Sequence, residues 1–232
     1  AKDQFAAFDP TAMAGFKADH FAALDHSYMT ALDKDHVAAF DPMAVAGFDD
    51  KHIAAFDTQA IAGFKADHVA AFDTTAITGL AKDQFAAFDP SAMAGFKADH
   101  FAALDHSYMT ALDKDHVAAF DPMAVAGFDD KHIAAFDTAA MAGFKADHVA
   151  ALDATAIAGL DKDQFAAFDP SAMAGFKADH FAAIDYGYMT ALGRDHVAAF
   201  DPMAVAGFDP EHVAAFDPMA VAGFDHTHFA AF

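Results

Sequence analysis

The chain has 232 residues, and its 35 Asp and Glu against 13 Lys and Arg give a formal net charge of -22 at pH 7. So acidic a surface argues against binding to nucleic acid or to anionic membranes, which attract clusters of positive charge. Cysteine is absent, which excludes disulfides and thiolate metal sites. Polar residues interrupt every apolar run before it reaches about 18 residues, so no membrane insertion is expected.

An eight-residue unit repeats without interruption, and the 232 residues make 29 such octads. The first two read AKDQFAAF at 1–8 and DPTAMAGF at 9–16. Position five of the octad is always Val, Ile, Met or Phe, and position eight is Phe or Leu everywhere except at Ile184. We therefore expect one continuous array over 1–232, because each unit of such a repeat contacts mainly its neighbours.

Two longer periods overlie the octad. The blocks 1–80 and 81–160 are nearly identical, and a third block, 161–232, holds nine octads in place of ten. Odd octads carry His or Gln at position four and Ala at position seven. Even octads carry Gly at position seven, except where a Tyr at position four is followed by Ala, as in Tyr28 and Ala31. This alternation indicates a structural period of sixteen residues.

Each octad has the signals of a new helix. In DPSAMAGF at 89–96, Asp is a preferred N-cap and Pro is favoured at the first helical position. Asp begins 21 of the 29 octads, so this start signal recurs every eight residues. One long helix is excluded, because an interior Pro costs about 3 kcal/mol and Pro recurs along the chain. Helices this short are unstable alone and must stack.

We predict an all-α repeat solenoid of very short helices, with eight residues per helix unit and about sixteen residues per coil. Odd helices would lie on one face and even helices on the other, with positions five and eight forming two interior ladders. The His or Gln at position four would reach back to the helix start as in a capping box. Gly or Ala at position seven would let the backbone turn or pack closely. A β-solenoid is the alternative, but the apolar i, i+3 spacing on an Ala background favours helices.

The motif VAAF at 37–40 and 69–72 resembles the I-A-A-L segment of L-T-T-A-Q-I-A-A octapeptide arrays, which occur in some large bacterial secreted and surface proteins. D-P-S-A or K-A-D-H stands here in place of T-T-A-Q. The resemblance covers the whole chain. It implies an extracellular or cell-surface structural segment and supplies no catalytic residues.

Histidines at position four are the main candidates for chemistry. At one coil per sixteen residues they would form a ladder down one face, where imidazole and neighbouring Asp suit zinc, copper or nickel. The Gln at equivalent positions, Gln84 and Gln164, instead favours a hydrogen-bonding or packing role. Adjacent coils of packed helices also lie about 8–10 Å apart, too far for two such histidines to share an ion. The candidate metal ligands are His20, His36, His52, His68, His100, His116, His132, His148, His180, His196, His212 and His228.

Other polar positions have simpler explanations. Asp225, His226 and His228 cluster in the last octad, and we expect a polar end of the array there instead of a chelating site. The Asp row at position one offers oxygen ligands of the kind that calcium prefers, but N-capping accounts for it. Met43 and its equivalents are expected to be exposed without ligating copper. Ser is scarce, Cys is absent and His is spread by the repeat, so we predict no enzyme activity and no required cofactor.

The leading functional hypothesis is a structural protein, either an extracellular filament subunit or a rigid surface spacer that associates end to end with copies of itself. It rests on an apolar pattern that continues to the last residues, HFAAF, with no polar terminal repeat. The alternative is a metal- or cation-binding surface protein that uses the His and Asp residues. A divalent metal is the one ligand that this alternative implies.

Overall fold

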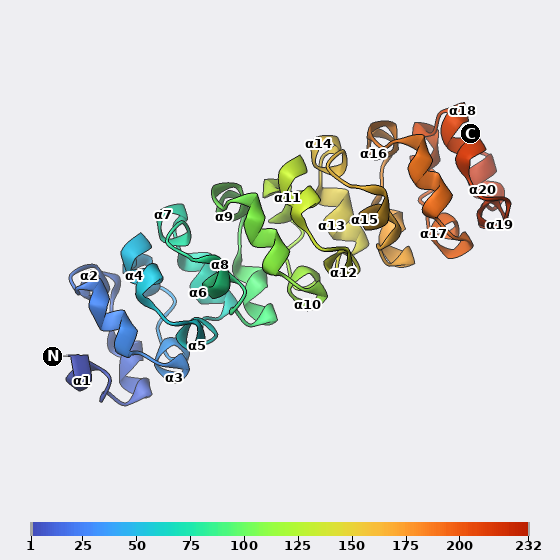
Figure 1. Cartoon of the computed structure of the whole chain (residues 1–232). Helices are drawn as coiled ribbons and strands as arrows, with labels where there is room; N and C mark the ends of the chain where they lie inside the picture. The colour runs from blue at the N-terminus through green and yellow to red at the C-terminus, as the bar shows by residue number, and fades with distance from the viewer. Residues whose placement is uncertain (1, 232) are drawn as a thin grey trace. The chain divides into compact units, whose positions relative to one another are not determined.

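In the computed structural model, which describes residues 2–231, each octad forms one short helix, and no strand occurs within that range. The all-α solenoid of one helix per octad is therefore confirmed, and Figure 1 shows these helices following one another within each part of the chain. All odd octads form α-helices, whereas nine of the even octads form 3-10 helices.

The α-helices are α1 (Lys2–Phe5), α2 (Ala18–Ala22), α3 (Lys34–Ala38), α4 (Asp50–Ala55), α5 (Thr58–Ile61), α6 (Ala66–Ala71), α7 (Thr74–Ile77), α8 (Lys82–Phe85), α9 (Ala98–Ala103), α10 (Lys114–Ala118), α11 (Asp130–Ala135), α12 (Thr138–Met141), α13 (Ala146–Ala151), α14 (Ala154–Ile157), α15 (Lys162–Ala166), α16 (Ala178–Ala183), α17 (Arg194–Ala198), α18 (Pro210–Ala215), α19 (Pro218–Val221) and α20 (His226–Phe229). The 3-10 helices are η1 (Pro10–Gly15), η2 (His26–Ala31), η3 (Val45–Gly47), η4 (Pro90–Gly95), η5 (His106–Ala111), η6 (Val125–Gly127), η7 (Pro170–Gly175), η8 (Tyr186–Ala191) and η9 (Ala204–Gly207).

The helix starts predicted from the sequence are confirmed. The side chain of Asp89 accepts a hydrogen bond from the backbone N–H of Ser91, with Pro90 as the first residue of the helix. Helices end between positions five and seven, and where the C-cap falls at position eight its backbone is extended, as is the N-cap that follows it. Phe72 and Asp73, for example, have φ/ψ of -64°/146° and -88°/168°. These two successive extended residues redirect the chain between helices.

The chain forms two compact units, which we describe separately. Unit 1 comprises Ala1–Ala111 and Ala119–Gly127, and unit 2 comprises Leu112–Ala118 and Phe128–Phe232. Their borders fall inside the second 80-residue block and not at its ends. The expectation of one continuous array over 1–232 stays a prediction. Among residues 2–231, no helix has the length and apolar character needed to span a membrane.

Within each unit, helices of octads three apart in sequence pack against one another, 24 residues along the chain. In unit 1 this gives the columns α1–η2–α4–α7–α9–η6, η1–α3–α5–α8–η5 and α2–η3–α6–η4, and Figure 1 shows α4, α7 and α9 lying next to one another. In unit 2 the columns are α10–α12–α15–η8–α18, α11–α14–α16–η9 and α13–η7–α17–α19.

The expected coil of about sixteen residues is therefore wrong, and so is the placement of odd and even helices on separate faces. We call a helix odd or even by the number of its octad and not by its label. Because three is an odd number, every odd helix packs on even helices, and each column alternates between the two kinds. The sixteen-residue alternation in the sequence does not correspond to one turn of the coil. It reflects the fact that each contact joins an odd octad to an even octad.

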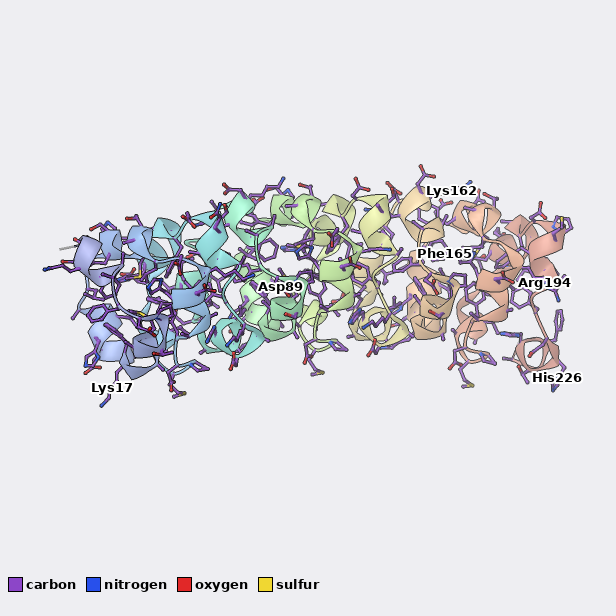
Figure 2. The ribbon with its side chains drawn as sticks, turned by 90° about the horizontal axis from the view of Figure 1, so that it is seen from below. Lys17, Asp89, Lys162, Phe165, Arg194 and His226 are labelled. Atoms are coloured by element: carbon purple, nitrogen blue, oxygen red, sulfur yellow. The ribbon has the colours of Figure 1, made fainter. Side chains whose placement is uncertain are left out.

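Positions five and eight form the core, as predicted. Phe165 at position five has no exposed surface, and Figure 2 shows its ring among the helices while Lys162 of the same helix points outward. Position-eight rings of successive octads meet edge to face. In unit 1 the ring centroids of Phe56 and Phe64 are 5.3 Å apart and those of Phe64 and Phe72 are 5.2 Å apart. Such aromatic contacts add about 0.5–1.5 kcal/mol to the stabilisation from the area that each pair buries.

The glycines at position seven serve close packing and not the turn, because no glycine among the described residues has a positive φ. A Cβ atom on Gly95 would lie 2.0 Å from the carbonyl oxygen of Ala66, at position two of the odd octad beneath it. Equivalent glycines such as Gly47 and Gly175 would meet the same obstruction at 2.0 Å. Gly15 differs, since a Cβ atom placed on it would have no other atom within 4 Å. Only glycine therefore fits where an even helix covers an odd one in this manner.

We expect Gly95→Ala to lower the free energy of unfolding by about 1–3 kcal/mol, the usual cost of inserting a methyl group into a closely packed contact. The loss should be visible as a lower midpoint in thermal or urea unfolding. Gly193→Ala is the matched control, because the nearest atom to its Cβ would be Nδ1 of His196 at 3.9 Å, an ordinary contact. Equal unfolding midpoints for the two variants would contradict this account of position seven.

Candidate functional site

The histidines at position four lie at the third residue of each odd helix, and most of them are buried. His68 and His100 are each 1% exposed and His180 is 0% exposed, although a histidine carries two polar ring nitrogens. A buried polar group of this kind is stable only when it is hydrogen-bonded. Within residues 2–231, no buried side-chain nitrogen or oxygen lacks a hydrogen-bond partner.

The Nε2 atom of these histidines donates to a backbone carbonyl at position eight, 28 residues earlier in the chain. In unit 1, Nε2 of His100 lies 3.1 Å from the carbonyl oxygen of Phe72. In unit 2, Nε2 of His180 lies 3.1 Å from that of Leu152. The same contact, at 3.0–3.2 Å, is made by His36, His52, His68, His196, His212 and His228. Each such bond joins an odd helix to the preceding coil.

The Nδ1 atom faces the start of its own helix. In octads that begin with Lys, Nδ1 accepts from the N-cap backbone N–H, at 3.1 Å for Lys65 and His68 and at 3.3 Å for Lys97 and His100. One ring nitrogen thus donates and the other accepts, which is the pattern of the neutral imidazole with its proton on Nε2. This fulfils the predicted capping-box role and adds to it the bond to the preceding coil.

In octads that begin with Asp, the same nitrogen has a second partner. Nδ1 of His36 lies 2.6 Å from Oδ1 of Asp33, and Nδ1 of His52 lies 2.6 Å from Oδ1 of Asp49. A carboxylate oxygen accepts a hydrogen bond from Nδ1 when that nitrogen carries the ring proton. The first residue of the octad, Lys or Asp, therefore decides whether Nδ1 has a carboxylate partner in addition to the backbone N–H.

Different groups have shifted pKa values in Lys octads and in Asp octads. Burial lowers the pKa of His68, His100 and His180, three buried histidines of Lys octads, from the ordinary value of 6.5. In Asp octads it is the carboxylate whose pKa is lowered, as at Asp33 and Asp49, chiefly because the backbone N–H of the histidine donates to it.

Glutamine performs the same task at the equivalent positions. Oε1 of Gln84 accepts from the backbone N–H of Ala81 at 2.7 Å, while its Nε2 donates to the carbonyl of Phe56 at 2.7 Å. Gln164 repeats this with Asp161 and Phe136. The hypothesis that hydrogen bonding is the shared requirement at position four agrees with these contacts.

Tyrosine at position four of an even octad is a partner that the sequence-based predictions missed. The hydroxyl of Tyr108 donates to the carbonyl of Leu80 at 2.6 Å, again 28 residues earlier, and Tyr188 does the same with Leu160 at 2.9 Å. The signal is present in the sequence, because Tyr occurs at position four only in the even octads that have Ala in place of Gly at position seven. Its shared register with His could have suggested a shared partner.

The structure does not bring the twelve candidate metal ligands together. Because columns advance by three octads, the row is divided among all three columns: in unit 1, His52 and His100 lie on one, His36 on another, and His20 and His68 on the third. The ladder down one face is therefore wrong. Among residues 2–231, no three His, Asp or Glu side chains are grouped as metal ligands. Metal ligation at these positions stays a prediction, and it would displace the bonds described above.

The remaining candidates are the polar residues of the last octad and the methionines of the Met43 type. In the last octad, His228 is buried and its Nε2 lies 3.0 Å from the carbonyl of Phe200, while Nδ1 lies 2.9 Å from Oδ1 of Asp225. His226 beside it is exposed. Met43 is 78% exposed, as expected.

A comparison with known proteins finds no family model that matches this sequence and no curated protein that matches it.

We expect His100→Gln to change the free energy of unfolding by less than about 1 kcal/mol, because Gln makes both hydrogen bonds at Gln84. His100→Leu should be far less stable, since it leaves a buried carbonyl and a helix-start N–H unpaired at about 1–3 kcal/mol each. Urea unfolding of the two variants measures the difference. Equal losses would mean that position four acts through its volume and not through its hydrogen bonds.

Stability should also depend on pH through the histidines of Lys octads. Because folding lowers the pKa of His68, His100 and His180, the unfolded chain binds these protons at higher pH than the folded chain does. Their contribution is complete above the ordinary value of 6.5 and is lost as the pH falls below it. The triple variant with Gln at all three positions should therefore lose less stability than the wild type between about pH 7 and pH 5. Parallel stability curves would contradict this.

Proposed function

We propose that the protein is a non-enzymatic structural protein, a filament subunit or rigid spacer, that associates end to end with further copies of itself. Each unit is built by contacts between helices of octads three apart. Octads 1–3 expose the surface that would pack on an earlier coil, and octads 27–29 expose the surface that would pack on a later coil. These two surfaces, which we call the earlier half and the later half of the contact, support the proposal. Association would bury apolar surface of both halves in a contact of the kind that already joins octads within each unit.

The later half is apolar. Position five is at most 6% exposed in the octads before the last three, yet Val213, Val221 and Phe229, at position five of octads 27, 28 and 29, are 42%, 37% and 59% exposed. In the interior this side chain is buried beneath the helix three octads later. These three residues therefore form an apolar surface shaped to receive another coil.

The earlier half lies on the first octads. Phe8 is 46% exposed, in contrast with the buried position-eight rings of the interior. The side chain of His20 is 51% exposed against 7% for His36, and within the described residues no carbonyl accepts from its Nε2. Nε2 of His20 and the ring of Phe8 are thus the kind of donor and apolar group that, within each unit, contact the coil before them.

An extracellular or cell-surface location is part of this proposal and rests on the resemblance to octapeptide arrays. The net charge of -22 agrees with a protein kept soluble at high concentration. Metal or cation binding, the alternative, is not favoured by the contacts of the described residues, because interior histidines such as His68 and His100 use both ring nitrogens in hydrogen bonds.

We expect the purified chain to form end-to-end oligomers whose length increases with protein concentration and with salt, because salt screens the repulsion between chains of charge -22. Sedimentation velocity and negative-stain imaging, each with and without a chelator, measure this. Oligomers that persist in chelator support the proposal. A monomer at every concentration and salt level would refute self-association, and oligomers that dissociate in chelator would support the metal-dependent alternative.

A further inference from the structure

The interior contacts obey a rule that fixes which helices can stack. Where an even helix covers an odd helix, its position-seven residue lies against the carbonyl at position two of the odd helix, and the space admits only Gly. The Cβ positions of Gly47, Gly79 and Gly127 would lie 2.0, 2.1 and 2.0 Å from such carbonyl oxygens. Odd helices carry Ala at position seven and cover even helices. The rule thus distinguishes permitted from forbidden pairs.

Three even octads are exceptions to this rule, and they share a sequence feature. Octads 4, 14 and 24 carry Ala at position seven and cover octads 1, 11 and 21, which are the octads with Gln at position four. In unit 1, Tyr108 of octad 14 binds the carbonyl of Leu80 directly before octad 11 and packs on Phe85 with ring centroids 5.7 Å apart. Ala is therefore accepted over a Gln octad and not over a His octad.

One glycine at position seven does not lie against a carbonyl oxygen. Gly15, at position seven of octad 2, is the only position-seven glycine in the described range with no atom within 4 Å of its Cβ position. At the other half of the contact, the position-two carbonyl of octad 29 belongs to His226, at the start of α20, which Figure 2 labels on the protein surface. Octad 29 is an odd octad with His228 at position four, so its covering helix must carry Gly.

We propose that, in the end-to-end association on which this inference rests, octad 2 of a second copy covers octad 29 and octad 1 covers octad 28. Gly15 then lies over the carbonyl of His226, and Val221 and Phe229 are buried beneath the second copy. The other two registers are forbidden by the rule. Octad 1 over octad 27, or over octad 29, would place the methyl group of Ala7 against the position-two carbonyl of Pro210 or of His226.

Gly15→Ala tests the joint without touching the fold. The new methyl group meets nothing within the chain, and Ala is the better helix former, so the unfolding midpoint should not fall. Association should weaken about tenfold or more, because the methyl group obstructs the carbonyl of the second copy. Gly193→Ala, which adds a methyl group away from both surfaces, should associate like the wild type. Sedimentation velocity over a concentration series measures all three proteins.

Cross-linking reads the register itself. Cysteine is absent from the chain, so Thr11→Cys in one population and Thr227→Cys or Met219→Cys in another introduce single thiols at position three of octads 2, 29 and 28. The proposed register predicts that a short bis-maleimide joins Thr11→Cys to Thr227→Cys. The intramolecular pair Asp67→Cys and Ser91→Cys, at position three of octads 9 and 12 in unit 1, calibrates the reaction.

The outcomes separate this inference from the proposed function. Weak association of Gly15→Ala together with the Thr11 to Thr227 cross-link supports the joint. Wild-type association that Gly15→Ala leaves unchanged, or a cross-link to position 219 in preference to 227, would overturn the register while the structural function stands. A wild type that does not associate at all would overturn both.

Discussion

The hydrogen bond from position four to a carbonyl 28 residues earlier is the constraint on which the rest of the structure depends. A helix of three to six residues cannot repay the cost of its own nucleation, so it must be held by its neighbours, and in the His, Gln and Tyr octads this bond holds it to the coil before it. The imidazole of His100 does this from both ends, since Nδ1 accepts from its own helix start and Nε2 donates to Phe72. One side chain thus closes the helix and fixes the position of the coil. Burial of position five beneath the following coil then supplies the apolar part of the same contact.

The local structure could be predicted because its causes are local. Asp at position one and Pro at position two specify helix starts, and the i, i+3 spacing of positions five and eight specifies the buried stripe. Exposure of Met43 and the capping role of position four follow from the same eight-residue pattern. The glycines stand out in the sequence, but their role as a place for a carbonyl, and not as a turn, depends on a neighbour 24 residues or more away.

The size of the coil could not be predicted, because the sequence period and the geometric period differ. An alternation of two kinds of octad suggests two octads per coil, whereas the packing advances by three. The two are compatible since an odd step always joins unlike octads, so a carbonyl of an odd helix always faces an even helix. A coil of sixteen residues would make a ladder of the His row. With the true step, His20 and His36 belong to different columns, and a shared metal site loses its geometric basis.

The 80-residue period also has a physical content beyond duplication. Three positions change together: Gln84 replaces His, and three octads later Tyr108 stands at position four and Ala111 replaces Gly. These residues meet in one contact, in which the Tyr108 ring packs on Phe85 and its hydroxyl binds the carbonyl of Leu80. Ala, and not Gly, stands at position seven of the octad that makes this contact. The same three changes recur ten octads later in unit 2, at Gln164, Tyr188 and Ala191.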